Sequence, residues 1–258
     1  MTQRLMTSAL FAGFAAALLA ALLHFAFVQD LILQAETYET GEAVHFAGVA
    51  KAAPDSAADH SSMGADVQTG PDGTGTITTD TTNAAAADAD AGSGALSRNL
   101  LTVLFAALVY VGDALLLVAG FGVASSLGIR IGLREGLLWG IAGFAAFQLA
   151  PAAGLAPELP GTIAADLSDR QIWWYGTVLA TAAALALIGY GRKAHLWVAG
   201  AVLLVLPHVI GAPQPDAYAG VAPPELAAAF AARVLAVGLV VWASLGALAG
   251  WIWNRNPA

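Results

Sequence analysis

The chain has 258 residues, of which 58% are apolar and only 11% are charged, and its net charge is −8. Because a soluble domain carries about 25% charged residues, this composition indicates a protein whose solvent is lipid, and it argues against nucleic-acid binding. The absence of cysteine excludes disulfides, thiolate metal sites and a cysteine nucleophile.

Six apolar segments are long enough, or nearly so, to cross the hydrocarbon core of a bilayer, which takes about 20 residues. They are residues 5–28, 99–122, 133–153, 171–190, 194–211 and 226–253. The fifth is short and contains Pro207, which is expected to kink or break a helix. The first has the basic start of a signal peptide but no clear cleavage site, which favours an uncleaved span. We predict an all-α fold, a polytopic membrane helix bundle with six transmembrane helices.

Residues 40–97 differ from the apolar segments, because they are rich in Ala, Asp, Gly, Ser and Thr and contain few large apolar side chains. Such a segment cannot bury enough surface to offset the entropy lost on ordering. We therefore divide the chain into three parts: a first transmembrane helix with an outer acidic extension (1–39), a flexible acidic periplasmic loop (40–97) and the five-helix remainder of the membrane bundle (98–258).

The basic residues predict the orientation of the bundle. Six of the ten lysines and arginines fall on one side of the six-span arrangement, namely Arg4, Arg130, Arg134, Arg192, Lys193 and Arg255. Positive charge marks the cytoplasmic side, so the N- and C-termini are both predicted to be cytoplasmic. Most acidic residues fall in the opposite, outer loops, where they either attract cations or simply keep the loops soluble.

Small residues predict close packing between helices. Glycines recur at every fourth residue into the third span and again in the sixth, at Gly128, Gly132, Gly136, Gly140, Gly246 and Gly250. This spacing lets helix backbones approach one another closely. At the start of the fourth span, Ser168 and Gln171 have the spacing of a capping box.

Five ionisable residues are candidate ligands or relays for a metal cation. Glu36 and Glu39 stand three apart and share a face if their segment is helical, although a solvated helix end explains them as well. His24 and His208 lie at similar predicted depth near the outer ends of the first and fifth spans. A lone intramembrane histidine often only hydrogen-bonds a neighbouring helix. Asp113 lies inside the second span and is expected to face the interior, as a proton or cation relay, as a partner of a neighbouring backbone group, or near enough to the inner interface to be hydrated.

Three blocks carry a resemblance to a known family. Residues 31–39 (LILQAETYE), residues 157–174 with PELPG and RQIWW, and residues 206–215 (LPHVIGAPQP) resemble the signature blocks of the CbtA family of proposed cobalt transporter subunits. The resemblance implies a multi-pass protein of the bacterial inner membrane that moves Co²⁺ inward for cobalamin synthesis. It also implies a small single-span partner, CbtB, with a histidine-rich metal-binding end.

Two functions therefore compete. The first is a membrane subunit of a divalent-cation importer, with cobalt as the favoured cargo, an outer carboxylate and histidine entry site, and no permanently bound cofactor. The second is a non-transporting membrane scaffold or accessory subunit that recruits a partner through its acidic outer loop. No phosphate-binding loop, His-Glu-x-x-His or Gly-x-Ser-x-Gly motif is present, so the sequence gives no support to an enzyme.

Overall fold

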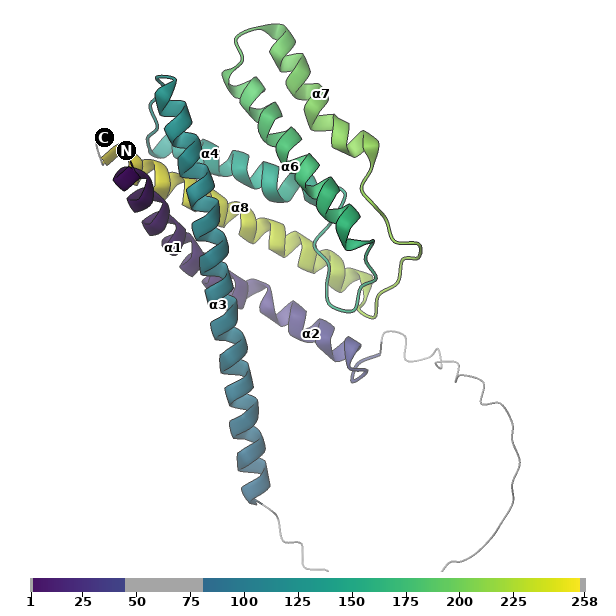
Figure 1. Cartoon of the computed structure of the whole chain (residues 1–258). Helices are drawn as coiled ribbons and strands as arrows, with labels where there is room; N and C mark the ends of the chain where they lie inside the picture. The colour runs from purple at the N-terminus through teal and green to yellow at the C-terminus, as the bar shows by residue number, and fades with distance from the viewer. Residues whose placement is uncertain (1, 45–80, 256–258) are drawn as a thin grey trace, which may run out of the picture. The chain divides into compact units, whose positions relative to one another are not determined.

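The computed structural model describes residues 2–44 and 81–255, with side chains in these ranges except for residues 81–95. The helices are α1 (Thr2–Phe27), α2 (Gln29–Glu39), α3 (Thr81–Ser126), α4 (Leu133–Phe144), the π-helix η1 (Ala145–Leu149), α5 (Ala150–Ala152), α6 (Leu167–Tyr190), α7 (Ala194–Ile210) and α8 (Pro224–Arg255) (Figure 1). No strand occurs in these ranges, which contain one isolated bridge, between Thr162 and Gly220. The predicted all-α fold is confirmed for this part of the chain.

The chain divides into two compact units, Met1–His45 with Leu101–Ala258, and Phe46–Leu100. In the second unit, the first turns of α3 begin at Thr81, inside the segment that the sequence predicts to be a flexible loop. Alanine, the strongest helix former, accounts for this start, because residues 84–87 are all alanine. The rest of that predicted loop, residues 45–80, lies outside the described residues.

Four helices are long and apolar enough to cross a membrane: α1, the part of α3 from Leu96 to Ser126, α6 and α8. Their outward surfaces carry large apolar side chains, such as Phe105 and Leu179, which are 63% and 70% exposed. A soluble monomer rarely exposes so much apolar surface, so these faces fit a lipid environment. The other two predicted spans are the 17-residue α7 and the continuous run of α4, η1 and α5. A count of six spans stays a prediction.

Helices α1 and α8 pack antiparallel, and arginines join them at both ends. Near the termini, Arg4 donates its Nε–H to the carbonyl oxygen of Trp253 at 2.7 Å and stacks over the Trp253 ring at 4.0 Å. At the other end, Arg233 donates to the carbonyl oxygen of Phe27, the last residue of α1, at 3.0 Å. The start of α1 and the end of α8 therefore lie side by side (Figure 1).

The glycines of α4 and α8 meet face to face, as their spacing predicts. A Cβ built on Gly136 would overlap the carbonyl oxygen of Gly246 and lie 2.9 Å from the Cα of Gly250. A Cβ on Gly140 would overlap the carbonyl oxygen of Trp242. Gly128 does not join this interface; it lies in the turn before α4 with φ +81°, and a Cβ there would meet nothing within 4 Å.

Helices α6 and α7 form a second packed pair. Trp173 of α6 donates its indole N–H to the carbonyl oxygen of Pro207 at 3.1 Å. Pro207 does not break α7, which continues to Ile210. The predicted capping box is wrong in its detail, because the N-cap of α6 is Asp166 and not Ser168. Both residue types cap helices well, and here the Asp166 side chain accepts from the Ser168 backbone N–H at 2.8 Å.

The buried core has two parts. The larger joins α1, α3, α4 and α8 around Phe121, Leu245 and Trp253. The smaller seats α2 on the N-terminal turns of α8, where Leu31 and Ala35 lie with Leu226 and Phe230. The larger core holds α1 against α3 and α8.

Candidate functional site

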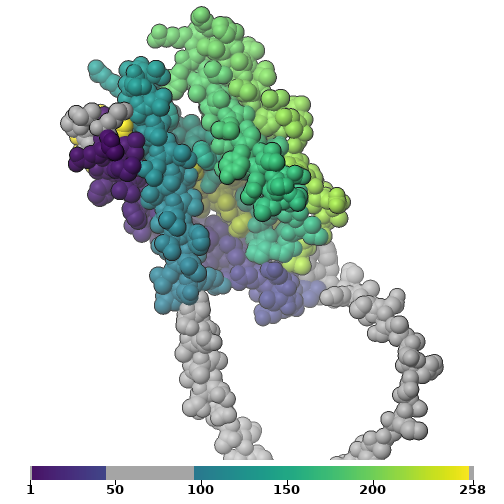
Figure 2. Space-filling model, viewed as in Figure 1, coloured from purple at the N-terminus to yellow at the C-terminus, as the bar shows by residue number. Residues whose placement is uncertain are grey.

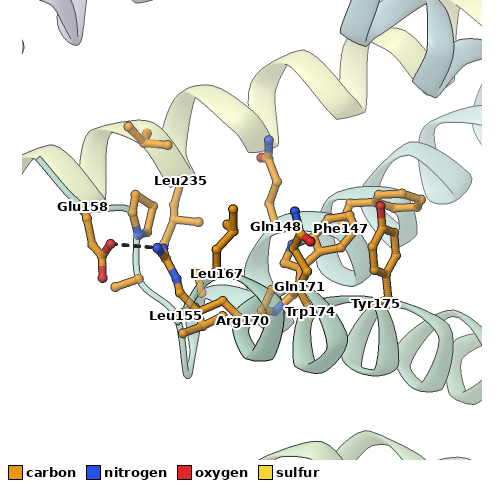
Figure 3. A pocket seen from close by; sticks show the side chains of 15 residues that line it. Phe147, Gln148, Leu155, Glu158, Leu167, Arg170, Gln171, Trp174, Tyr175 and Leu235 are labelled. Atoms are coloured by element: carbon orange, nitrogen blue, oxygen red, sulfur yellow. Dashed lines mark hydrogen bonds and ion pairs between the residues drawn. The ribbon is translucent and has the colours of Figure 1, made fainter. Parts of the chain in front are cut away.

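Three cavities lie between the helices of the first unit. The first, here called the α6 cavity, has a volume of about 500 Å³ and is lined mainly by η1, α6 and the segment between α5 and α6. At one end the Arg170 guanidinium donates to the Glu158 carboxylate at 3.0 Å. Figure 3 shows this ion pair apart from Trp174 and Tyr175, with Gln148 reaching toward α8 between them. Polar groups therefore occur at the end and in the middle of this cavity.

The second cavity, here called the His24 cavity, has a volume of about 180 Å³. Its walls come from α1, α3, η1 and α8. Its lining residues are Ala20, Ala21, His24, Val28, Thr102, Ala106, Tyr110, Gln148, Val234, Val237 and Gly238. Among these, His24, Tyr110 and Gln148 each bring a nitrogen or oxygen donor, so three elements distant in sequence contribute polar groups to one small space.

Gln148 is placed by a break in the regular helix. It belongs to η1, a π-helix of five residues between α4 and α5, and such segments occur frequently at functional sites. Its Oε1 is buried and accepts no hydrogen bond from the part of the chain that the structure describes. A Cβ on Gly238 of α8 would overlap this oxygen, so the glycine leaves the space that the amide occupies.

The third cavity, here called the Asp113 cavity, has a volume of about 540 Å³ and lies among α3, α4 and α6, with Trp242 of α8 also in its wall. Figure 2 shows the surface hollowed between α3 and α6, with α8 behind. Its walls are mostly apolar, with Asp113 and Glu135 as the two carboxylates that line it. The Trp139 indole N–H donates to the Tyr190 hydroxyl at 2.7 Å on the same wall.

The structure places the five predicted site residues apart. His24 and Asp113 are half-buried and line different cavities. His208 is exposed near the end of α7, where its ring meets the edge of Trp173 at 6.0 Å between centroids. Glu36 is half-buried and Glu39 exposed on α2. Over the described residues, no three histidines, cysteines or carboxylates lie close enough to hold a metal together.

Among the described carboxyl groups outside the membrane-spanning segments, that of Asp166 has a clearly shifted pKa. The hydroxyl and the backbone N–H of Ser168 both donate to Oδ1 of Asp166, at 2.6 and 2.8 Å. The hydroxyl contributes most, and together these hydrogen bonds lower the pKa of the Asp166 carboxyl below its usual value. The same hydrogen bonds cap the start of α6, one turn before Arg170.

The chain matches one known family over nearly its whole length. The family model described as "Probable cobalt transporter subunit (CbtA)" matches residues 2–254. The chain belongs to the CbtA family. No curated protein and no solved structure matches the chain significantly. The match confirms the resemblance seen in the three sequence blocks, and membership of the CbtA family makes this chain a membrane protein of metal-ion transport rather than a member of an enzyme class.

Two polar residues near His24 are not among the residues that the sequence predicts as ligands. Gln148 and Tyr110 both line the His24 cavity, yet neither is among the predicted ligands. A signal for both is present in the sequence, because each is a polar side chain inside a long apolar segment, where such groups are uncommon and often functional.

Proposed function

We propose that this chain is the membrane subunit of a divalent-cation importer whose cargo is Co²⁺. The observation that carries the proposal is the match of residues 2–254 to a family described as a cobalt transporter subunit. The helices long and apolar enough to cross a membrane, and the cavities between them, supply the setting that a transport path needs. Transport by alternating exposure of such cavities is the expected mode of action.

In this proposal the five predicted residues act as successive stations rather than as one coordination sphere. Glu36 and Glu39 of α2 concentrate the cation, and His208 assists at the end of α7. His24 receives the ion in its cavity, and Asp113 relays charge from a different cavity. A path with several weak sites suits transport, because conduction needs binding that is favourable enough to enter and weak enough to leave.

The proposal includes six spans in a bacterial inner membrane, with both termini cytoplasmic and α2 at the outer face. The short span is α7, whose apolar length of 17 residues suffices if the bilayer thins or the flanking residues snorkel. A single-span CbtB-like subunit is the proposed partner. The side-by-side position of Arg4 and Trp253 supports a common side for the two termini.

Cobalt uptake tests the proposal. Radioactive Co²⁺ accumulation is measured in cells that express the chain with and without the single-span partner, and then with Glu36→Ala and His208→Ala. Because both sites face the proposed entry, we expect each variant to take up Co²⁺ several-fold more slowly at limiting concentration. His195→Ala is the matched control for His208, since His195 is also exposed and lies in the first turn of the same helix.

The outcomes separate the two candidate functions. Uptake by the wild type that is unchanged in both variants would refute the entry residues but leave the importer in place. No uptake in any combination, with the chain correctly inserted in the membrane, would favour the alternative, a non-transporting scaffold that recruits a partner through its acidic outer loop.

A further inference from the structure

The His24 cavity has features that the five predicted ligands do not explain. Its polar side chains come from α1, α3 and η1, and one of them, Gln148, keeps a buried amide oxygen without a hydrogen bond from the described part of the chain. A buried acceptor left unpaired costs free energy, and in a membrane no bulk water offsets that cost. An acceptor retained under these conditions points to a ligand that it meets during function.

We propose that the His24 cavity is a cation-binding site formed by the His24 imidazole, the Gln148 amide oxygen and the Tyr110 hydroxyl. This inference rests on the proposed function, and it deepens it by naming the residues that hold the ion inside the membrane. Imidazole nitrogen and neutral oxygen donors suit a divalent metal of intermediate softness such as Co²⁺. They also suit weak binding, since none of the residues lining this cavity is a carboxylate.

The size of the cavity is compatible with a partly hydrated ion. Its volume is about 180 Å³, and a water molecule occupies about 30 Å³ in the liquid. An ion can therefore bind these three donors while it keeps several of its own waters. Retained waters reduce the desolvation cost that a divalent cation would otherwise meet among neutral ligands.

Gln148 also connects the His24 cavity to the α6 cavity. It lines both, as does Val234 of α8. The α6 cavity ends at the Glu158–Arg170 ion pair, on the segment that leads into α6. An ion that enters beside Glu158 would thus reach His24 by passing Gln148, the side chain that the two cavities share.

Two structural features position Gln148 between the His24 cavity and the α6 cavity. The π-helical geometry of η1 shifts the residues that follow α4 relative to a regular helix, and Gly238 makes room on α8. A Cβ on Gly238 would overlap Oε1 and lie 2.9 Å from the amide carbon of Gln148. A substitution at Gly238 should therefore displace the amide without removing any donor atom.

Equilibrium binding of Co²⁺ to the purified full-length chain tests the site independently of transport. Isothermal titration gives the dissociation constant, and the Co²⁺ d–d absorption bands report on the ligands. We expect Gln148→Leu and His24→Leu each to weaken binding at least about tenfold, and His24→Leu also to change the d–d bands. Gln171→Leu is the matched control, because Gln171 lines the α6 cavity but not the His24 cavity.

A third variant guards against a folding defect. Gln148→Glu keeps the size of the side chain and adds a charge. Because a carboxylate is a stronger ligand for the cation, this variant should bind Co²⁺ at least about tenfold more tightly. Its Co²⁺ uptake should be slower, because release of the ion becomes harder. Wild-type affinity in all three variants would overturn the inference. If that occurred while the wild type still took up Co²⁺, the proposed function would stand; if binding behaved as expected but no uptake occurred, the proposed function would fail alone.

Discussion

The glycine contact between α4 and α8 makes a quantitative prediction about stability. A Cβ on Gly136 would lie 2.9 Å from the Cα of Gly250, whereas ordinary contact begins at 3.4 Å, and it would overlap the carbonyl oxygen of Gly246. All of these neighbours are backbone atoms, so no side chain can rotate away. In Gly136→Ala the two helices must therefore separate by at least about 0.5 Å along their contact.

Separation of these helices loosens the larger core, because Leu245 and Trp253 of α8 are buried in it. Overpacking of this kind costs about 1–3 kcal/mol in soluble cores, and we expect Gly136→Ala to lose stability in that range. Gly246→Ala should behave alike, since its Cβ would lie 2.6 Å from the Cα of Gly140. The free energy of unfolding is measured in detergent or bicelles from tryptophan fluorescence.

Gly176→Ala is the matched control for these variants. Gly176 lies in the middle of α6, and a Cβ there would meet nothing within 4 Å. The same methyl group should therefore leave stability unchanged or raise it slightly, because alanine has the higher helix propensity. If Gly136→Ala were as stable as Gly176→Ala, the close backbone contact between α4 and α8 would be refuted.

Three further predictions lie outside this interface and concern the Arg233 contact, the N-cap of α6 and the orientation of the chain. Arg233→Gln removes the guanidinium that caps α1 and should lower the melting temperature by an amount equivalent to about 1 kcal/mol or less, because the side chain is exposed; no change would refute the cap. The Ser168 hydrogen bonds lower the pKa of Asp166, so its stabilisation is complete above the ordinary carboxyl pKa of about 3.9 and is lost as the pH falls through the lower folded value. Asp166→Ala should accordingly unfold more easily near pH 7, with the difference from wild type shrinking at acid pH; a pH-independent difference would contradict this. Because the chain lacks cysteine, Ala219→Cys should react with an impermeant maleimide on intact cells and Ala194→Cys only after permeabilisation; the reverse pattern would invert the predicted orientation.

The sequence predicts the helices well because lipid leaves the backbone few choices. A segment in the hydrocarbon core must satisfy its own N–H and C=O groups, so an apolar run of about 20 residues becomes a helix. The glycine spacing is informative for a related reason. Gly136 and Gly246 have no side chain, so their regular spacing can only allow two helix backbones to approach closely. Orientation rests on loop charges, which the isolated fold does not test.

Other features depend on where the chain folds back, and local sequence does not determine them. Asp166 and Ser168 are both residue types that cap helices well. The course of the preceding loop decides that Asp166 is the N-cap of α6. The π-helix at Ala145–Leu149 has no local signal, because its residues would also form a regular helix. Gln148 and Gly238 are 90 positions apart in the sequence, and their contact depends on the packing of η1 against α8.

The separation of carboxylates from the His24 cavity follows from the cost of charge inside a membrane. A carboxylate in the lining of this cavity would need either a counterion or protonation, and in its ionised form it would hold a divalent cation tightly. Neutral donors such as Gln148 and Tyr110 need no counterion and release the cation more readily, but they bind Co²⁺ more weakly. Glu36 and Glu39 can offset that loss from α2, because acidic groups at a surface raise the local concentration of cations. On this argument, high salt should slow uptake by the wild type more than by Glu36→Ala, since screening weakens the contribution that the variant already lacks.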